Sequence, residues 1–269
     1  MKVELIAEIG WNHQGDMELA KKMIFEAKKN GADYAKFQTW SVDKLVPGPW
    51  DKDGRREIYQ KAQLTKERHI ELIKYCNEVG IKFLSSASSI QAAQLLLDLG
   101  CNEVKIPSME ASNTSLLKFV NEHFDRIILS LGAHTLAEAK QAINTFNKEK
   151  LVILHCVSVY PCDYSMANIP KMKILQSIHD RVGYSDHIQG VDSAKVAIGE
   201  GAVIIEKHFT TDNNLPGRDN VFAILPEDLN ELSIFIKRRE EMFIDHGVDF
   251  LPQEQDSRDN YRGRWDGKN

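Results

Sequence analysis

Short apolar segments alternate with amphipathic segments along most of this 269-residue chain. Each apolar segment has the length of a buried strand, and the intervening segments carry apolar residues at the spacing of one helix face. In the segment that begins at Met17, for example, Leu19, Met23, Ile24 and Ala27 share such a face. The predicted strands are residues 3–8, 34–38, 82–86, 103–106, 126–130, 151–156, 182–185 and 203–207, and the clearest helical segments are residues 17–30, 65–79, 89–99, 135–147, 192–200 and 226–241.

Eight strand–helix repeats within about 250 residues favour a closed (β/α)8 barrel, an α/β fold, over an open doubly wound sheet. An open dinucleotide-binding sheet carries a GxGxxG loop after its first strand, and residues 9–16 do not match that pattern. We therefore expect a single-domain TIM barrel over residues 1–245. A polar tail over residues 246–269 should lie on the surface or be disordered. Two long connections, residues 39–64 and 209–225, are candidate substrate lids.

Charge and apolar content argue against several classes of partner. A net charge of −5 gives no basis for binding nucleic acid or an acidic membrane surface. Acidic residues near the start stand where a signal peptide needs an apolar run, and no apolar stretch approaches the ~20 residues of a membrane span. The cysteines lack the paired spacing of a zinc site or a disulfide framework, which predicts a reducing, cytoplasmic location. They are Cys76, Cys101, Cys156 and Cys162.

Two histidines stand at the ends of the last two predicted strands. His187 and His208 are 21 residues apart, about the length of one helix and one strand. The carboxyl ends of the strands form the active end of a (β/α)8 barrel, so both imidazoles would reach the same rim. Such a pair can ligate a catalytic metal. Two unrelated polar histidines are the simpler alternative.

Two lysines, Lys36 and Lys105, interrupt otherwise apolar strands. Burying them is costly unless an anion pairs with them. Internal ion pairs with Glu8, Glu110 or Glu206 are one interpretation. A Schiff-base nucleophile is another, although that chemistry has no use for a metal held by two histidines. A third interpretation is a cradle for a phosphate and an adjacent carboxylate, completed by hydroxyl groups. The hydroxyl donors would be Ser108, Ser130 and Ser185.

Several short motifs occur in a fixed order along the chain. They are Ala7-Glu8-Ile9-Gly10, Asn12-His13, Gly15-Asp16, Lys36-Phe37-Gln38-Thr39, Leu154-His155-Cys156, Tyr160-Pro161, Gly183-Tyr184-Ser185-Asp186-His187, Glu206-Lys207-His208-Phe209 and Leu215-Pro216-Gly217. With these motifs the chain resembles the sialic acid synthase family of bacterial nonulosonate synthases, over about residues 3–240. Members of that family join phosphoenolpyruvate to an N-acetylmannosamine-like amino sugar, release phosphate and form a 3-deoxy-2-keto sugar acid.

The resemblance implies a role for each matching position. His187 and His208 would hold a divalent metal, commonly Mn²⁺, with Mg²⁺ and Co²⁺ as alternatives. Glu8 and Glu206 would be the catalytic carboxylates, one of which transfers a proton. The phosphoenolpyruvate site would comprise Lys36, Ser86 (a threonine in most of the family), Lys105, Ser108, Ser130, Ser158 and Ser185. The sugar would contact Glu8, Gln38, Glu110, Tyr160 and Asp219.

The chain departs from the family pattern at the rim. Pro107 stands where the family has glycine or alanine, Leu131 replaces a threonine, and Arg218 adds a cation beside Asp219. Family members continue into a small antifreeze-like domain, which reaches across a homodimer and supplies an arginine to the partner's sugar site. We expect a homodimer here as well, in which a separate polypeptide supplies that domain or an arginine of this chain takes its place. The candidates are Arg218, Arg258, Arg262 and Arg264.

Three functions remain to be compared. The first is metal-dependent condensation of phosphoenolpyruvate with an amino sugar. The second is a related 3-deoxy-ulosonate synthase that takes a different acceptor, phosphorylated or otherwise altered, and Arg218 is the feature that favours it. The third is a non-catalytic barrel that binds a sugar or a partner enzyme. Such a module needs neither two rim histidines nor two buried lysines, so the sequence favours an enzyme.

Overall fold

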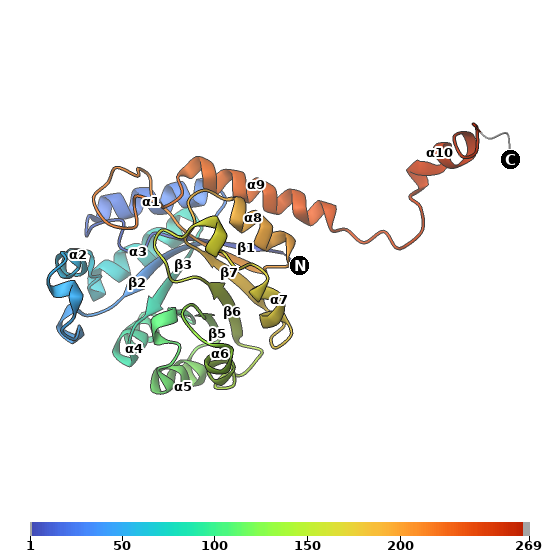
Figure 1. Ribbon diagram of the computed structural model, residues 1–269. Coiled ribbons are helices and arrows are strands. Elements are labelled where there is room, and N and C mark those ends of the chain that lie inside the picture. Colours follow the sequence, from blue (N-terminus) through green and yellow to red (C-terminus); the bar gives the residue numbers. More distant parts are fainter. Residues whose placement is uncertain (1, 266–269) are drawn as a thin grey trace.

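Eight parallel strands form a closed barrel in this computed structural model, which describes residues 2–265. Each strand pairs with its neighbours in the sequence, and the last strand pairs with the first (Figure 1). The predicted (β/α)8 fold is therefore confirmed, and every predicted strand agrees with the observed one to within one residue at each end. The strands are β1 (Glu4–Glu8), β2 (Tyr34–Thr39), β3 (Lys82–Ala87), β4 (Glu103–Ile106), β5 (Arg126–Ser130), β6 (Leu151–Cys156), β7 (Val182–Asp186) and β8 (Ile204–His208).

Helices surround the barrel (Figure 1). Residues at several helix ends make the hydrogen bonds or turns with which helices typically begin and end. The side chains of Asp16 and Thr65 accept hydrogen bonds from backbone N–H groups in the first turn of the helices that follow them. The third helix ends at Gly80, whose φ of 74° is the left-handed conformation that glycine adopts readily. The α-helices are α1 (Met17–Lys29), α2 (Arg55–Ala62), α3 (Lys66–Val79), α4 (Ile90–Asp98), α5 (Thr114–His123), α6 (Leu136–Ile143), α7 (Lys171–Gln176), α8 (Asp192–Gly199), α9 (Pro226–Met242) and α10 (Gln255–Asn260).

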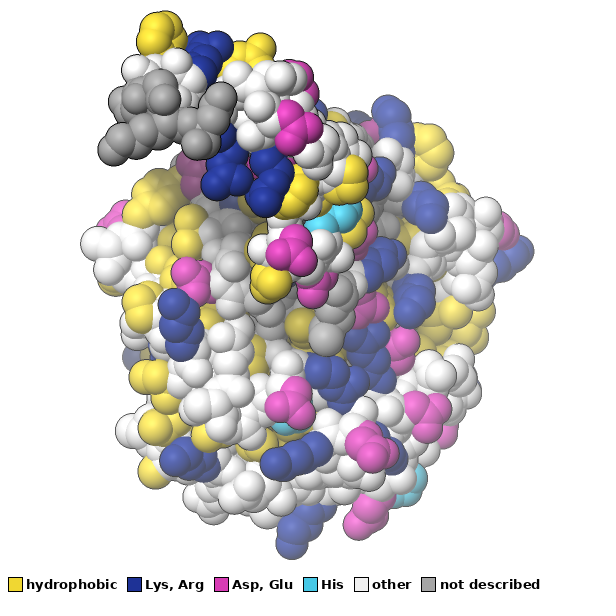
Figure 2. All heavy atoms as spheres, turned by 90° about the vertical axis from the view of Figure 1, so that its right-hand side faces the viewer, with side chains coloured by type: hydrophobic (Ala, Val, Ile, Leu, Met, Phe, Trp, Pro, Cys, Tyr) yellow, Lys and Arg dark blue, Asp and Glu magenta, His cyan; other side chains and the backbone are white. Residues whose placement is uncertain are grey.

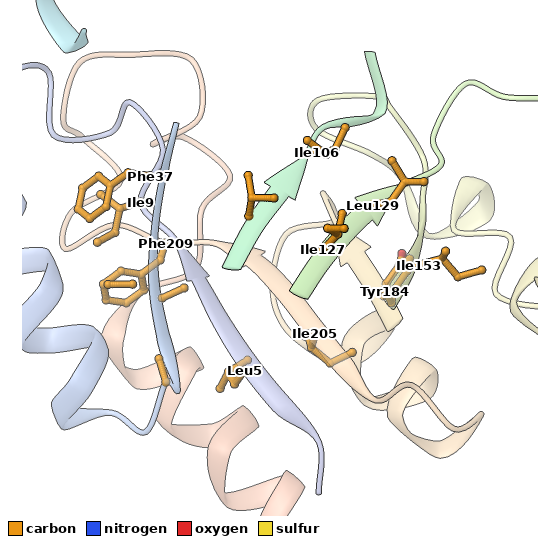
Figure 3. Close-up of a cluster of buried hydrophobic side chains, with 14 of the residues drawn as sticks. Leu5, Ile9, Phe37, Ile106, Ile127, Leu129, Ile153, Tyr184, Ile205 and Phe209 are labelled. Carbon is orange, nitrogen blue, oxygen red and sulfur yellow. The ribbon is translucent and has the colours of Figure 1, made fainter. Parts of the chain in front are cut away.

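The main hydrophobic core lies between the strands and the helices. Successive side chains of a strand point to opposite faces, and both faces of this sheet are buried. Leu5, Phe37, Leu129, Ile153 and Ile205 belong to one continuous buried cluster that also contains side chains of the helices (Figure 3). This arrangement explains why the strands read as nearly continuous apolar runs in the sequence.

The interior of the barrel has three layers along its axis. At the amino ends of the strands, Arg126 forms ion pairs with Glu4 and Glu103. At the carboxyl ends the inward side chains are again polar and charged. The apolar layer between them is made of Ile6, Tyr34, Leu84, Ile128, Val152, Leu154 and Ile204. This plug separates the two charged ends, so a site at the carboxyl ends can be reached only from that side.

The long connection over residues 39–64 contains more structure than the sequence pattern predicts. It holds two 3-10 turns, η1 (Val42–Lys44) and η2 (Pro49–Asp51), followed by α2. Ala62 is the buried residue of α2, so this helix has almost no apolar face from which it could be predicted. The sequence pattern also did not single out α5 and α7. The other candidate lid, residues 209–225, is largely irregular and is joined to the barrel by a bridge between Phe209 and Ile224.

The C-terminal segment leaves the barrel after α9. Residues 246–265 are all exposed, and the turn η5 (Pro252–Glu254) and α10 form at a distance from the barrel (Figure 1). Figure 2 views the molecule from the side on which this segment extends. We expected a tail that lies on the surface or is disordered, and did not predict α10. The sequence of this helix carries no apolar pattern from which it could be recognised. The domain boundary after residue 245 stays a prediction, and residues 266–269 lie outside the described part of the chain. No helix within residues 2–265 combines the length and apolar character needed to cross a membrane.

Candidate active site

Charged side chains gather inside the barrel at the carboxyl ends of its strands. Glu8, Lys36 and Glu206 each follow a residue of the apolar plug by two positions, so alternation turns them into the same interior. Lys105 and Ser185 join them from β4 and β7. All five residues are at most 4% exposed. The sequence predicts this group correctly because parallel strands deliver their last inward side chains to one end of a barrel.

Glu206 lies between the two buried lysines. Lys105 Nζ is 3.2 Å from Glu206 Oε1, and Lys36 Nζ is 3.6 Å from Glu206 Oε2. Lys36 Nζ also lies 2.6 Å from Glu8 Oε2, and the Ser185 hydroxyl donates to Glu206 Oε1 at 2.9 Å. The predicted internal ion pairs therefore form with Glu8 and Glu206. Both cations are already desolvated, so an incoming anion would meet them without displacing their water.

The pKa values of this cluster follow from burial and mutual attraction. Burial acts against the charge of Lys36, but Glu206 and Glu8 together raise its pKa above the ordinary value. Burial lowers the pKa of Lys105 despite the attraction of Glu206. Burial would raise the pKa of Glu206, but Lys105 and Lys36 hold it well below its usual range. Lys36 is thus a poor candidate for a Schiff-base nucleophile, which must be neutral.

Hydroxyl groups form a wall beside the lysines, centred on Gly132. A Cβ atom at Gly132 would lie 2.3 Å from Ser158 Oγ, 2.9 Å from Ser108 Oγ and 3.0 Å from Cys156 Sγ. The backbone N–H of Gly132 donates to Ser108 Oγ at 2.9 Å. The Oγ atoms of Ser130 and Ser158 are buried and have no hydrogen-bond partner among the described residues. Buried polar atoms of this kind usually serve a ligand or an ordered water molecule.

The two histidines lie next to each other on this rim. Their ring centroids are 5.3 Å apart, and the Tyr160 ring packs 4.1 Å from that of His187. His187 Nδ1 lies 2.7 Å from the carbonyl oxygen of Val157, which leaves Nε2 free to ligate. His208 Nδ1 lies 3.3 Å from a carboxylate oxygen of Asp219. Burial opposes the charge of His208, but Asp219 brings the net pKa above its ordinary value.

These contacts fit a metal that takes two nitrogen ligands from the protein. A ligating histidine usually has its second ring nitrogen bound to a carbonyl or a carboxylate, and Val157 and Asp219 supply those two groups. Within residues 2–265, no group of three or more His, Cys, Asp or Glu side chains is arranged to hold a metal. The remaining ligands would therefore come from substrate or water.

The residues predicted to contact the sugar are brought together only in part. Gln38 donates to Glu8 Oε1, and Asp219 lies against His208, so both stand at the rim. Arg218 is half-exposed, with its guanidinium 4.0 Å from Asp53 of the residue 39–64 connection. Glu110 accepts a hydrogen bond from Asn113 in the turn η3 (Ser108–Glu110), and its contact with the sugar stays a prediction. Ser86 is buried opposite Lys105 in the strand register.

Two features of the rim were missed by the sequence reasoning. Cys156 faces the interior, with its sulfur 4.0 Å from His187 Nδ1. Its neighbour His155 points outward, and its Nε2 lies 2.8 Å from the carbonyl oxygen of Ala167. Strict alternation from Leu154, a residue of the apolar plug, would have predicted both orientations.

A closed parallel barrel with buried charges at the carboxyl ends of its strands is the architecture of the (β/α)8-barrel enzymes. More particularly, the chain belongs to the NeuB family, which matches residues 23–246. The relatives below are synthases, and this chain is accordingly an enzyme of the sugar-acid synthase type. The non-catalytic alternative is not supported.

Three similar proteins illustrate the family. The N,N'-diacetyllegionaminic acid synthase of Legionella pneumophila is 36% identical over an alignment of 250 residues, and the match covers 85% of this chain and 69% of that protein. The N-acetylneuraminate-9-phosphate synthase of Drosophila melanogaster is 32% identical over an alignment of 251 residues, and the match covers 87% of this chain and 67% of that protein. The crystal structure of an N-acetylneuraminic acid synthetase from Leptospira borgpetersenii, in complex with citrate, has a TM-score of 0.89 and 29% identity. It covers 100% of this chain and 94% of that one.

Proposed function

We propose that this enzyme condenses phosphoenolpyruvate with an N-acetylmannosamine-like amino sugar, in a metal-dependent reaction that yields a sialic-acid-type nonulosonate and phosphate. The observation that carries the proposal is the position of two buried lysines and two histidines on one rim of the barrel. Glu206 pairs with both lysines, and Ser185 donates a hydrogen bond to Glu206. These two residues lie two positions before His208 and His187 on the same inward faces.

Phosphoenolpyruvate would bind between the lysines and the hydroxyl wall. Its phosphate and carboxylate are anions, and Lys36 and Lys105 are buried cations on the inner side of this end of the barrel. The hydroxyls of Ser130 and Ser158 have no partner within the described structure and would donate to its oxygens. Ser86, Ser108 and Ser185 complete the proposed site. A hydrogen-bonded, charged cradle of this kind fixes the orientation of a planar anion before it reacts.

The acceptor sugar would lie on the solvent side of this cradle, against Gln38, Tyr160 and Asp219. A divalent metal at His187 and His208, Mn²⁺ in our proposal, would supply Lewis-acid polarisation of the aldehyde oxygen. Carbon 3 of phosphoenolpyruvate attacks the aldehyde carbon, and water adds at carbon 2. The water gives up its two protons, one to the former aldehyde oxygen and one to the departing phosphate. Phosphate leaves by cleavage of the carbon–oxygen bond, which forms the keto group.

We assign the proton transfer to Glu8 and an electrostatic role to Glu206. The lysines hold the pKa of Glu206 well below its usual range, so that carboxylate stays ionised and is a weak base. Glu8 accepts a hydrogen bond from Gln38, one of the proposed sugar contacts, and lies beside Gly10 of the loop after β1. The Glu8 carboxylate is therefore better placed to pass a proton from the water to the aldehyde oxygen of the acceptor.

A phosphorylated acceptor is the second candidate, and the position of Arg218 favours it. The Arg218 guanidinium is half-exposed at the rim, beside Asp219, and approaches Asp53 only at 4.0 Å. The relative from Drosophila melanogaster, by its name, makes a 9-phosphate product. In either version Arg218 contacts the acceptor, so the change Arg218→Ala should raise the acceptor KM about tenfold, which is about 1.4 kcal/mol. An unchanged acceptor KM in steady-state kinetics would remove Arg218 from the site.

The quaternary arrangement and the location are also proposals. We propose a homodimer, in which a tail arginine (Arg258, Arg262 or Arg264) or a separate antifreeze-like domain protein completes the partner's sugar site. The tail stands clear of its own barrel, so its side chains are free to reach a second molecule (Figure 1). The cytoplasmic location expected from the cysteine pattern stays a prediction.

The test of the proposed function is a screen for phosphate release. Purified enzyme is incubated with phosphoenolpyruvate, added Mn²⁺ and a panel of 2-acetamido sugars, with and without a 6-phosphate. We expect phosphate release that requires both the metal and one class of sugar, either the free sugars or the 6-phosphates. The class that supports release identifies the acceptor. Phosphate release that does not depend on the sugar, or no release with any member of the panel, would contradict the proposal.

A further inference from the structure

The residues directly before the two rim histidines form a buried ion pair on the other side of the barrel wall. His187 and His208 face the interior, so Asp186 and Lys207 face outward. The two residues are opposite each other in the register of β7 and β8. Lys207 Nζ lies 3.0 Å from Asp186 Oδ2, and the two side chains are 2% and 0% exposed. The pair therefore connects the two strands at the points where the histidines leave them.

Further hydrogen bonds tie this pair to the backbone around His187. Asp186 Oδ1 accepts from the backbone N–H of Ile188 at 3.0 Å, and Oδ2 accepts from the Ser193 hydroxyl at 2.6 Å. The Lys207 ammonium also donates to the carbonyl oxygen of Ile188. Both the N–H and the carbonyl oxygen of Ile188 are therefore held by the ion pair. Because Ile188 directly follows His187, these contacts fix the backbone on the C-terminal side of that histidine.

Stability alone is a weak reason for charges at this place. Removing two ions from water costs several kcal/mol per ion, and apolar side chains of similar volume often replace a buried ion pair without loss of stability. The pair does offer directional contacts that packing lacks. It makes no hydrogen bond or ion pair with Glu8, Lys36, Lys105 or Glu206 in the described structure, so it is placed to act through the strands.

We propose that the Asp186–Lys207 ion pair is a positioning clamp that sets the separation and orientation of His187 and His208, and hence the affinity of this site for a divalent metal. This inference rests on the proposed metal-binding role of the two histidines. Groups that orient metal ligands from outside the coordination sphere typically change metal affinity about 10- to 100-fold. The clamp should act on that scale although neither residue touches the metal.

The experiment measures the Kd for Mn²⁺ by electron paramagnetic resonance of the free ion, with no substrate present. The variants are Lys207→Met, Asp186→Asn and the double variant, in which no buried charge is left unpaired. Lys195→Met is the matched control, because Lys195 pairs with Glu231 and Asp192 at α8 on the outer surface. Circular dichroism and thermal unfolding establish that each variant is folded.

We expect the Kd for Mn²⁺ to rise about 10- to 100-fold in the three clamp variants and to stay at the wild-type value in the control. Folded clamp variants with the wild-type Kd would overturn the clamp and leave the metal site intact. A wild-type protein that binds no Mn²⁺, or that keeps its affinity when both histidines are replaced by alanine, would overturn the metal site itself. A double variant that fails to fold would show that the pair is needed for the barrel, which also overturns the proposal.

Discussion

Glu206 is the residue on which the polar end of the barrel most depends. Its carboxylate forms ion pairs with Lys36 and Lys105 and accepts a hydrogen bond from Ser185. All of these groups lie inside the barrel, where they are almost fully removed from water. Breaking a buried ion pair by removing one partner costs about 3–5 kcal/mol, because the remaining charge is left without compensation. The ion pairs of Glu206 also hold the ammonium groups of Lys36 and Lys105 inside the polar end of the barrel. One glutamate thus both stabilises the lysines and holds them in position for an anion.

The first prediction concerns Gly132, whose missing side chain leaves room beside the serines. The change Gly132→Ala would place a Cβ atom within 3.0 Å of Ser158, Ser108 and Cys156, so these groups must move. We expect the KM for phosphoenolpyruvate to rise at least tenfold, about 1.4 kcal/mol, in a steady-state assay.

A matched control for this change is available in α8. The change Gly199→Ala adds a Cβ atom with no neighbour within 4 Å, and Gly199 lies near the end of a helix far from the serine wall. That variant should keep the wild-type KM. A Gly132→Ala enzyme that also keeps the wild-type KM would show that phosphoenolpyruvate does not bind against this wall.

At the scale of elements, two loops are joined into one support beside the site. The Asn12 side chain, in the loop after β1, donates to the carbonyl oxygen of Phe209, in the loop after β8, at 2.9 Å. In the other direction, the side-chain amide of Asn220 donates to the carbonyl oxygen of Asn12 at 3.4 Å. Asn220 directly follows Asp219, so this contact helps to hold the carboxylate that faces His208. The same support buries His13 completely.

His13 makes this support sensitive to acid. Burial, with a smaller effect of Arg68, lowers the pKa of His13 from 6.5 to about 4. The unfolded chain therefore binds the proton more readily than the folded one, and the stability that neutral His13 contributes above pH 6.5 is lost as the pH falls toward 4. Because the unfolded state gains this proton first, the free energy of unfolding should fall by about 2 kcal/mol between neutral pH and pH 5.

Urea unfolding at pH 7.5 and pH 5.0 tests this prediction on the wild-type protein and on His13→Asn. Asparagine removes the titrating group and keeps a short polar side chain. The free energy of unfolding of the wild type should fall by about 2 kcal/mol more than that of the variant. Equal losses in the two proteins would show that His13 is not protonated on unfolding in this range.

At the scale of the whole molecule, a layered interior separates stability from chemistry. The apolar plug and the outer core hold the barrel together, and the ion pairs of Arg126 close its amino-terminal end. The carboxyl end can therefore carry buried charges without being part of the main core. The tail, described over residues 246–265, adds nothing to this interior and remains exposed.

The sequence predicts the barrel well because its signals are local and repeated. Each strand is a short apolar run, and alternation within the runs places Lys36 and Lys105 inside. It does not predict features that depend on packing between distant segments. The approach of Arg218 to Asp53 depends on how two irregular loops settle against each other, and α2 has too little apolar surface to be recognised. The helix in the tail has no apolar face at all.

The most direct test of the account follows the oxygen that joins carbon 2 of phosphoenolpyruvate to phosphorus. The enzyme, Mn²⁺, the acceptor found in the screen and phosphoenolpyruvate labelled with ¹⁸O at that position are incubated, and both products are analysed by mass spectrometry. We predict a product that contains the carbons of both substrates and released phosphate that carries all of the ¹⁸O. Cleavage of the bond between carbon 2 and the bridging oxygen leaves that oxygen on phosphorus, so the keto acid should carry none of the label. Label retained in the keto acid, or phosphate released without a joined product, would contradict it.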